Sequence, residues 1–448
     1  MKRFFNTLKH IWSIEDLRKK ILVTLGFIAV YRFGSFVVLP GIDTNSLQNY
    51  TDQAQKGLQG LIDIFAGGAF SRASIFALGI MPYISASIVI QLMGIAVPYF
   101  QKLQKDGESG RNKQNQITRL LTIAISAVQS VSYIINLKSQ SPEAIVGADI
   151  MSPMLFMIVN VLLLTTGTLF VMWLGEKITD RGIGNGISLI IMIGIIARFP
   201  QSIVQEIGNR MSTEGAGLIV LLLELVVLLF VILVTVMLVQ GVRRIPVQYA
   251  KRVIGDKPQG GKRDFLPLKV NASGVMPIIF AQALMFVPGA IAGALGSDSG
   301  FWVILADFKS VPYNVVFFLL VVIFTYVYTA LIVNPQQYAD HLKRQNAFIP
   351  GVKQGNDTAE YIDEVTTLVT LPGSIALGLI SIIPGIAAAT ITTNVGFAIF
   401  FGGTSLLILV AVVLDTLQQV DGHLSMHGYD VRKIKGRTRT TETEDSVL

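Results

Sequence analysis

The sequence has no cysteine and few charged residues. Its 448 residues include no Cys, four His and three Trp, and Asp, Glu, Lys and Arg together make up 15% of the chain. Without Cys the chain has no disulfide framework, no thiolate nucleophile and no cysteine-ligated metal. Because about a quarter of an average soluble domain is charged, this value is far outside the usual range. These absences exclude several enzyme classes and argue against a soluble globular domain.

The sequence also lacks a nucleotide-binding motif. The segment GDKPQGGKR (255–263) departs by one residue from P-loop spacing and has no Ser or Thr after its lysine. RGIGNGIS (181–188) resembles a dinucleotide glycine motif but begins an apolar helix, which is the wrong context. His423 and His427 have no third metal ligand nearby, so solvated histidines at a helix end are the simpler interpretation. We expect no catalytic residue, no metal and no cofactor, and any ATP-driven work falls to a partner protein.

What the sequence does contain is long apolar runs. Hydrophobic residues make up 52% of the chain, and the mean hydropathy is +0.59. A bilayer core about 30 Å thick needs a helix of about 20 apolar residues, so the runs predict about ten spans. Their centres are near Val30, Ile88, Ala127, Leu162, Ile191, Val227, Ala283, Phe318, Leu379 and Leu406. The predicted fold class is an all-α polytopic membrane protein with ten transmembrane helices.

Basic residues fall mainly on one side of the predicted spans. If the spans alternate from a cytosolic N-terminus, twenty-nine of the 36 Lys and Arg residues lie on that side. Because cytoplasmic loops carry an excess of Lys and Arg, this pattern places both termini in the cytosol. The seven exceptions are Arg32, Lys56, Arg72, Lys138, Arg198, Arg210 and Lys309. No cleavable signal peptide is visible, and the charged N-terminus is typical of an interfacial helix.

Two loops on the cytosolic side are longer and more polar than topology requires. They span 241–270 and 334–366, and the first carries eight basic residues. Long polar loops between spans usually carry function or contact a partner. We therefore expect both loops to contribute to a docking surface.

The apolar segment 64–94 is longer than one span and is interrupted by glycines and a proline. Gly67 and Gly68 stand near its start, and Gly79 and Pro82 stand in its middle. Lipid cannot satisfy the N–H and C=O groups of non-helical backbone, so such a break survives only where it faces protein or a water-filled cavity. The interruption therefore indicates a pathway through the membrane.

Two pairs of short motifs indicate a duplication. GIMPYI (79–84) in the second span matches GVMPII (274–279) in the seventh, and GISLII (186–191) in the fifth matches GTSLLI (403–408) in the tenth. Two matches in the same order are much rarer by chance than one. Because five is odd, the two five-helix halves lie in opposite orientations, as in inverted repeats. The predicted halves are 1–207 and 208–425, arranged around a central pore and followed by a cytosolic tail at 426–448.

The duplication places four isoleucines at one depth. Ile84 and Ile279 lie about eight residues into their helices, and Ile191 and Ile408 lie about nine or ten residues in. At about 1.5 Å per residue all four are roughly 12–15 Å deep. Entering a core about 30 Å thick from opposite faces, they meet near its midplane. Ordinary helix packing explains any single isoleucine, but the symmetric set predicts an apolar constriction of the kind that gates by dewetting.

A secondary solute transporter with inverted repeats is the alternative that this pattern leaves open. Such carriers usually place ionisable residues at mid-membrane. Here Glu224 is the clearest acid within a span, and Asp415 lies toward the cytosolic end of the last one. We expect Glu224 to pair with a polar or basic group on a neighbouring helix or a partner subunit. The bare spans favour a passive channel over an ion-coupled carrier.

Several long motifs closely resemble the SecY family of protein-conducting channel subunits. They are GGAFSRASIFALGIMPYISASIVIQL (67–92), ITDRGIGNGISLII (178–191), RRIPVQYAKR (243–252), LPLKVNASGVMPIIFA (266–281), NPQQYADHLKRQNAFIPG (334–351) and FGGTSLLI (401–408). The likeness extends from about Trp12 to about Asp415. It implies a channel through which unfolded polypeptides cross the bacterial cytoplasmic membrane, and from which membrane proteins enter the lipid laterally.

The resemblance also implies the residues of four functional sites. The family's plug, a short half-helix that closes the channel from outside, falls on about 61–71 and includes Leu61, Ile64, Phe65, Gly67, Gly68, Phe70 and Ser71. Its pore ring falls on Ile80, Ile84, Ile187, Ile191, Ile279 and Ile408, of which the duplication selects four. Its lateral gate, between the second and seventh spans, falls on Gln91 and Asn271. Its partner-binding residues fall on Arg243, Arg244, Lys251, Arg252 and Lys353, the last at a position where the family commonly has Arg.

The partners that the resemblance implies are other proteins and lipid. They are a SecE-like and a SecG-like subunit, the SecA ATPase, the ribosome, signal sequences, unfolded client polypeptides and the membrane lipid beside the lateral gate. Because the chain itself carries no motif for nucleotide chemistry, the resemblance and the residues agree that it is not an enzyme.

Overall fold

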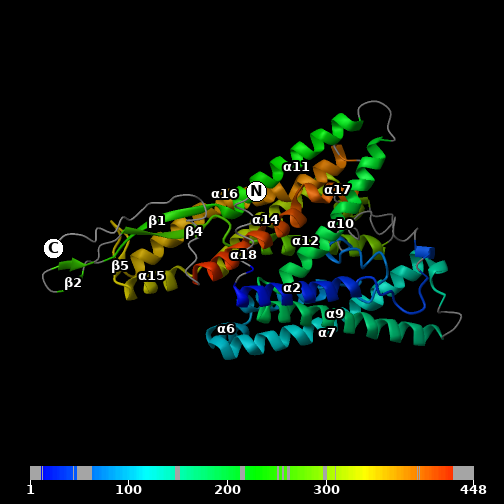
Figure 1. The fold of residues 1–448 in the computed structure, drawn as a ribbon, viewed down its shortest axis with the longest axis horizontal. Coiled ribbons are helices and arrows are strands. Elements are labelled where there is room, and N and C mark those ends of the chain that lie inside the picture. The colour runs from blue at the N-terminus through cyan, green and yellow to red at the C-terminus, as the bar shows by residue number, and fades with distance from the viewer. Residues whose placement is uncertain are drawn as a thin grey trace.

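The computed structural model describes most of the chain. The described residues are 12, 14–43, 45–47, 63–146, 152–211, 217–249, 252–254, 257–259, 263–295, 300–307, 309–390, 392 and 394–426. The predicted plug residue Leu61, the predicted partner-binding residue Lys251 and the tail from 427 onward lie outside them. For Arg252 the described part is the backbone alone. Within the described residues the chain is mainly helical (Figure 1).

The helices and strands follow the chain in this order. The first part contains α2 (Glu15–Gly34), α5 (Met81–Ala96), α6 (Pro98–Lys105), α7 (Gly107–Gln140), α9 (Pro153–Arg181) and α10 (Gly186–Met211). The second part contains α11 (Gly217–Gln240), α12 (Met276–Leu295), α13 (Gly300–Ala306), α14 (Val311–Ile332), α15 (Pro335–Arg344), α16 (Asn356–Thr390), α17 (Val395–Ala398) and α18 (Gly403–Met426). Between them lie the strands β1 (Val242–Tyr249), β2 (Arg252–Ile254), β3 (Lys257–Gln259), β4 (Arg263–Lys269) and β5 (Ala347–Phe348).

All the predicted span centres lie inside helices, although not every helix is a full apolar span. Among the described residues, seven helices are long and apolar enough to cross a bilayer, and the α5–α6 pair, bent by 99°, makes eight if it is one span. α2 falls outside this set because it opens with the charged stretch EDLRKK. α12 falls outside because its described apolar stretch is the short one at Met276–Met285. The count of ten spans stays a prediction.

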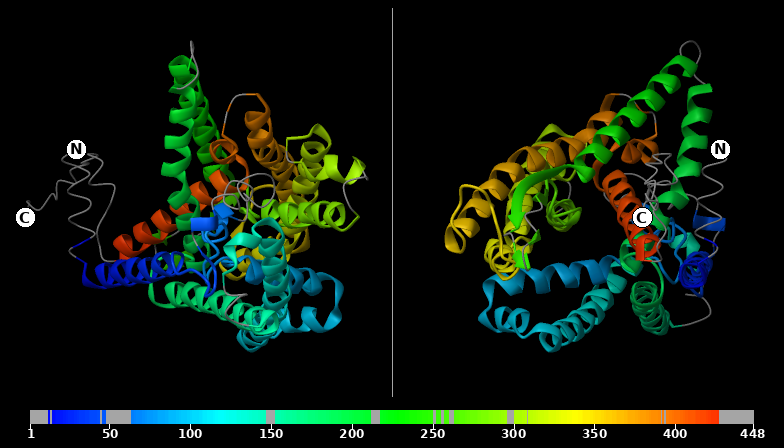
Figure 2. Two further views of the ribbon diagram at one scale, coloured as in Figure 1. Left: turned by 90° about the vertical axis from the view of Figure 1, so that its right-hand side faces the viewer. Right: turned by 60° about the vertical axis from the view of Figure 1, so that its left-hand side comes forward.

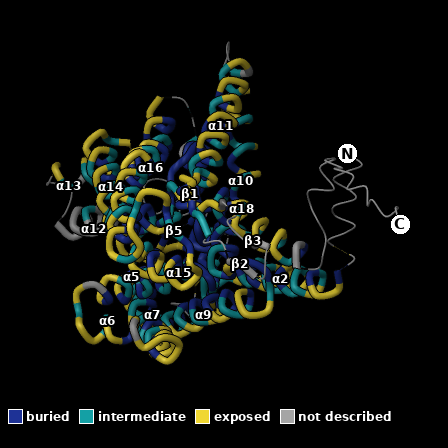
Figure 3. Tube along the Cα trace, turned by 90° about the vertical axis from the view of Figure 1, so that its left-hand side faces the viewer, coloured by how far each residue is buried: buried dark blue, intermediate teal, exposed yellow. Residues whose placement is uncertain are grey.

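The outer helices present apolar side chains to their surroundings. α11 has the highest hydropathy of the seven, 3.3, and only 22% of its apolar window is buried inside the chain. Exposed leucines such as Leu222 and Leu229 are 65% and 61% exposed. Because lipid tails are as apolar as leucine, such faces are expected where a helix meets the bilayer. Figure 3 shows the exposed face of α11, and Figure 2 shows that α10 and α11 project from the other helices.

The duplicated motifs start equivalent helices. α5 begins at Met81 and α12 at Met276, which are the third residues of GIMPYI and GVMPII. The preceding Gly79 and Gly274 both have left-handed backbone, with φ of 53° and 65°, a conformation that glycine adopts without strain. α10 and α18 both begin at the first glycine of their motifs. Helices at equivalent places in the two halves therefore start at equivalent positions of the repeated motifs.

The expected depth of the isoleucines within their helices is wrong. Ile84 and Ile279 are the fourth residues of α5 and α12, and Ile191 and Ile408 are the sixth residues of α10 and α18. The reason is that left-handed glycines interrupt the apolar runs, so that turns precede α5 and α12, bends precede α10, and a short 3-10 helix (Ile399–Phe401) precedes α18. The four side chains lie in the first two turns of their helices.

The two long loops fold together into one small sheet. β1 pairs antiparallel with β4 and with β5, giving the strand order β4-β1-β5. The sheet therefore joins loop 241–270 to loop 334–366, and α15 lies beside it at one end of the molecule (Figure 1). Strand alternation buries Ile245 and Val247 of β1 against Leu342 and Ile362. This separate core gives the two loops a common, rigid shape.

The largest buried cluster lies around the turn segment that precedes α5. It includes Ile64, Phe65 and Phe70 of this segment together with Ile191 of α10 and Ile408 of α18. The turn segment before α5 is thus the centre of the packing.

Candidate functional site

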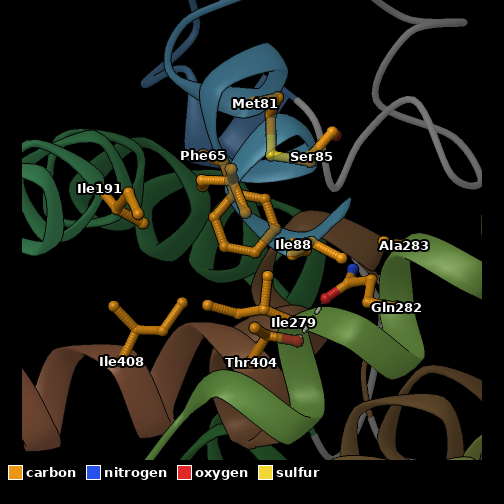
Figure 4. A pocket seen from close by; sticks show the side chains of 11 residues that line it. Phe65, Met81, Ser85, Ile88, Ile191, Ile279, Gln282, Ala283, Thr404 and Ile408 are labelled. Carbon is orange, nitrogen blue, oxygen red and sulfur yellow. Dashed lines mark hydrogen bonds between the residues drawn. The ribbon is translucent and has the colours of Figure 1, made fainter. Parts of the chain in front are cut away.

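A small cavity lies where α5, α10, α12 and α18 meet the segment 63–80. Its volume is about 20 Å³, which is room for about one water molecule and far too little for a polypeptide. Ile84, Ile191, Ile279 and Ile408, the four isoleucines that the duplication selects, all line it, and Figure 4 labels the last three. The other lining residues are Phe65, Met81, Ser85, Ile88, Gln282, Ala283 and Thr404. The sequence repeat therefore brings four side chains to one place.

Two of the three polar side chains in the wall of the cavity bond to each other. Thr404 of α18 donates its hydroxyl hydrogen to Oε1 of Gln282 on α12, and the two residues are 7% and 5% exposed. Polar groups that bond to each other offer less to water than free ones. Because the isoleucines offer water no hydrogen bond, the wall is mainly apolar, as a dewetting constriction requires.

The remaining two predicted ring residues do not line this cavity. Ile80 caps the start of α5 and is 3% exposed. Ile187, one turn before Ile191, packs toward α9, where its Cγ1 lies 3.0 Å from the position that a Cβ on Gly175 would take. Both belong to the apolar cluster around the cavity. The role of all six residues as a pore ring stays a prediction.

Phe65 belongs to the segment that the resemblance identifies as the plug, and it closes one side of the cavity. It is 8% exposed and lies across from Ile279 and Ile408 (Figure 4). Of the described plug residues, only 63–65 are helical and the rest form turns. Gly67 and Gly68 have φ of 65° and 83°, so the turns need glycine there. The described part of the plug therefore consists mainly of turns, where the resemblance implies a short half-helix.

Side chains of α2, of α7 and of the residue that follows the plug donate hydrogen bonds to the backbone carbonyls of the plug. Arg32 of α2 donates from Nη1 to the Gly67 oxygen at 2.7 Å, and Arg72 donates from Nη2 to the same oxygen at 2.9 Å. The Tyr133 hydroxyl of α7 donates to the Phe70 oxygen at 2.7 Å. These bonds pair carbonyl groups that would otherwise be buried and unsatisfied.

A buried ion pair joins the plug to α10. Asp63 is 1% exposed and Arg198 is 9% exposed. Arg198 Nη2 donates to Asp63 Oδ2 and, at 2.6 Å, to the Ser71 hydroxyl. The other carboxylate oxygen of Asp63 accepts the Ser71 N–H at 2.8 Å. Motif analysis did not find this pair, although Arg198 is one of the seven basic residues that depart from the charge asymmetry.

The two predicted gate residues make separate contacts. Gln91 of α5 accepts at Oε1 a hydrogen bond from the Tyr328 hydroxyl of α14 at 2.5 Å, and its Nε2 donates to the Ser87 hydroxyl at 3.0 Å. Asn271 is 6% exposed and accepts a bond from the Ser273 hydroxyl at 3.3 Å. Gln91 therefore bridges α5 to α14, a contact that sequence analysis missed.

Aromatic packing closes the seam that Gln91 bridges. Ile88 of α5, Phe280 of α12 and Tyr328 of α14 form one buried cluster. The rings of Phe280 and Tyr328 meet edge to face, with centroids 4.8 Å apart, a favoured arrangement. The seam between α5, α12 and α14 is therefore held shut by one hydrogen bond and a small apolar cluster.

The comparisons with known proteins identify the family. The family model described as SecY matches residues 74–417, which is more than half of the chain. The chain belongs to the SecY family. The protein translocase subunit SecY of Streptomyces scabiei is 42% identical over 434 residues, covering 94% of this chain and 97% of that protein. The protein translocase subunit SecY of Chlamydia muridarum is 38% identical over 444 residues, covering 95% and 97%.

Solved structures of related channels share the fold. A structure described as that of a protein conducting channel matches with a TM-score of 0.62 and 17% identity, covering 94% of this chain and 95% of the other. Sec61 in the canine ribosome-channel complex matches with a TM-score of 0.56 and 16% identity, with the same coverage. The chain is therefore a multi-pass membrane protein with the fold of the SecY and Sec61 channels.

The acid that a carrier could use for ion coupling is paired in this SecY-family chain. Arg210 of α10 donates from Nη2 to Glu224 Oε1 of α11 at 2.6 Å and from Nε to Glu206 Oε1 at 3.0 Å. Glu206 Oε2 accepts the Asn394 N–H at 2.8 Å. Both acids are fully buried. The expected pairing of Glu224 with a basic group on a neighbouring helix is confirmed.

Two of the predicted partner-binding residues lie on the small sheet and Lys353 lies near it, whereas the backbone of Arg252 belongs to β2, which pairs with β3 in a separate two-stranded sheet. Arg243 and Arg244 are exposed on β1, opposite Leu268 and Pro267 of β4. Lys353 is exposed a few residues after β5, and its backbone oxygen accepts the Thr358 hydroxyl at 2.6 Å. Within the described part of the chain these three cations form no ion pair. Their charges are therefore available to a partner.

Proposed function

We propose that this chain is the pore-forming subunit of a protein translocase, a passive channel for unfolded polypeptides. The observation that carries the proposal is the ring of four isoleucines around a cavity of about 20 Å³ that Phe65 of the plug closes. In this conformation neither a polypeptide nor a stream of ions can pass. Family membership and close relatives named as translocase subunits support the same function.

Opening requires the plug to leave and the isoleucines to separate. Branched apolar side chains can then surround a passing chain closely without forming hydrogen bonds that would hold it back. The same side chains discourage a continuous column of water around it, which limits ion flow. A membrane helix of the client would leave through the seam between α5, α12 and α14, where its apolar side chains exchange water for lipid.

The partners of the proposed channel supply the energy and the client. We propose a SecE-like and a SecG-like subunit, and SecA or a translating ribosome docked on the exposed cations of the small sheet, with both termini in the cytosol of a bacterium. The structure of canine Sec61 in a ribosome-channel complex supports a ribosome as partner. Signal sequences and unfolded client polypeptides would enter from the same side.

Reconstitution tests this function against the carrier alternative. Vesicles containing the chain and a SecE-like subunit should translocate a signal-bearing client only after a motor or ribosome is added, because the chain has no nucleotide site of its own. Protease protection of the client measures the transport. Saturable, ion-coupled uptake of a small solute by the purified chain alone would instead establish a carrier.

The seam gives a second prediction. Tyr328→Phe removes the hydrogen bond to Gln91 while keeping the ring in the aromatic cluster. A buried hydrogen bond is worth about 1 kcal/mol, so its loss should lower the equilibrium constant for the closed seam roughly fivefold. Signal sequences should then crosslink to α5 more readily. Tyr326→Phe is the matched control, because the hydrogen bonds of Gln91 go to Tyr328 and Ser87. Equal crosslinking in the two variants would mean that this bond does not hold the seam.

A further inference from the structure

We infer that Arg198 is the positioning residue that holds the plug in its closed place. It acts through the ion pair with Asp63 and the bond to Ser71, which form a unit called here the plug catch. The inference rests on the proposed function, because it assumes that the plug must move before a polypeptide can pass. It adds to that function a specific pair of charges that decides when the plug moves.

The side chain of Arg198 links the two ends of the described plug to each other and to α10. Arg198 reaches Asp63 at the start of the described plug and Ser71 at its end, while Asp63 also accepts the Ser71 N–H. The segment between them is thus closed into a loop whose two ends share one guanidinium. Gln201, a turn further along α10, accepts from Arg198 Nη1 at 3.0 Å and fixes the guanidinium in this orientation.

The backbone of α10 is shaped to receive this loop. A Cβ at Gly194 would lie 2.5 Å from the Phe65 oxygen and 3.2 Å from the Gly67 nitrogen, so only glycine allows the plug to approach this closely. Gly194 is one turn before Arg198 on the same helix. The close approach brings the guanidinium over Gly68, where a Cβ would meet Arg198 Nε at 2.8 Å.

Burial makes the catch dependent on both of its charges. A buried ion pair is costly to break from one side, because the remaining charge is left without a partner, whereas replacing both charges is often close to neutral. Arg32 and Arg72 stand on the other side of the plug, at the Gly67 oxygen. Loss of Asp63 would therefore leave three arginines around one segment without its only described carboxylate.

A second small cavity at the edge of the catch has polar walls and room for one water molecule. Arg198 Nε has no hydrogen-bond partner among the described residues, and the cavity, of about 20 Å³, lies beside it. Polar groups of Asp63, Gln201 and Gln205 line this cavity, so it meets the requirements for holding a water molecule. A guanidinium that lines a cavity able to hold water can be solvated there once the plug withdraws.

The test uses a single thiol as a reporter of plug position. The chain has no cysteine, and Ala69 of the plug is fully buried, so Ala69→Cys should react with a water-soluble maleimide only when the plug leaves. In the reporter background, Asp63→Asn or Arg198→Met should each raise the reaction rate roughly a hundredfold, as an unpaired buried charge implies. The double variant should return to within about tenfold of the parent.

Two further variants separate the catch from general loss of stability. Arg198→Lys keeps the charge and should react more slowly than Arg198→Met. Arg210→Met removes another, partly buried arginine of α10 that pairs with Glu206 and Glu224, and it should leave the thiol protected. Reaction in Arg210→Met as fast as in Arg198→Met, additive effects of the two catch variants, or no effect of either would each overturn the inference.

A separate arm checks the proposed function itself. Adding a motor and a signal-bearing client to the parent reporter should expose Cys at position 69 during translocation. If the client crosses while the thiol stays protected, the plug does not move and the proposed role of the plug fails. If the thiol is exposed by the client but not by the catch variants, the channel stands and only the catch is refuted.

Discussion

Replacing Ile84, Ile279 and Ile408 together with glycine is expected to make the idle channel leak ions. The change removes three of the four isoleucines that surround a cavity of about 20 Å³, so water can fill the constriction and ions can follow it. We expect the conductance of the idle channel to rise about tenfold or more above background. Single-channel recording in a planar bilayer, or anion efflux from vesicles, measures it.

The control for this variant removes three apolar side chains that face outward. Leu222, Leu229 and Leu233 of α11 are 65%, 61% and 55% exposed, and replacing them with glycine should leave the idle conductance at background. Deleting the plug should leak less than the ring variant, because nearby backbone can fill the space. An idle conductance that does not change in the ring variant would place the constriction elsewhere.

Reversing Arg243 and Arg244 to glutamate is expected to weaken the binding of SecA or a ribosome about tenfold in physiological salt. Both cations are exposed on β1 and form no ion pair within the described part of the chain. Exposed charges act over roughly a Debye length, about 8–10 Å, so they attract acidic protein or RNA to this sheet. Sedimentation with vesicles that contain the variant measures the binding.

Two controls accompany this measurement: the topology of the variant, and the reversal of a second pair of charges. Twenty-seven of the twenty-nine cations predicted to be cytosolic remain, so span orientation and subunit assembly should not change. Arg111→Glu with Lys113→Glu reverses two exposed cations at the start of α7, outside the small sheet, and should leave binding close to that of the parent. Inverted topology, or unchanged binding and translocation in the β1 variant, would mean that Arg243 and Arg244 serve orientation alone.

Two substitutions of Lys353, with different expected effects on docking, test the same prediction. Lys353→Glu should impair docking because it reverses an exposed charge near β5. Lys353→Arg should be neutral or should tighten binding, because the planar guanidinium adds a bidentate donor fork. Weaker binding by Lys353→Arg than by the parent would show that this site recognises the ammonium group itself.

Those features of the fold that depend on local sequence could be predicted. Apolar runs placed every span centre inside a helix, because burial in lipid leaves helix as the only continuous backbone structure for such a run. The repeated motifs identified two pairs of equivalent helices, although the helices start later than expected; before one pair, Gly79 and Gly274 have left-handed backbone. The same repeat selected four residues around the central cavity.

The contacts that hold the site closed depend on the three-dimensional fold and could not be predicted. Asp63 and Arg198 are 135 residues apart, and Gln91 and Tyr328 are 237 apart, so no local pattern links either pair. The one available signal was the set of basic residues outside the cytosolic loops. Arg32, Arg72 and Arg198 belong to it, and the structure brings all three to the plug.

The central claim is that a polypeptide passes through the isoleucine ring, and a disulfide trap tests it most directly. Because the chain has no cysteine, Ile408→Cys provides one thiol at the cavity, and a client arrested during translocation carries another. We predict a disulfide between Ile408→Cys and the arrested client, and none with Leu229→Cys on the exposed face of α11. A translocating client that never crosslinks to Ile408→Cys, or that crosslinks equally to Leu229→Cys, would contradict the account.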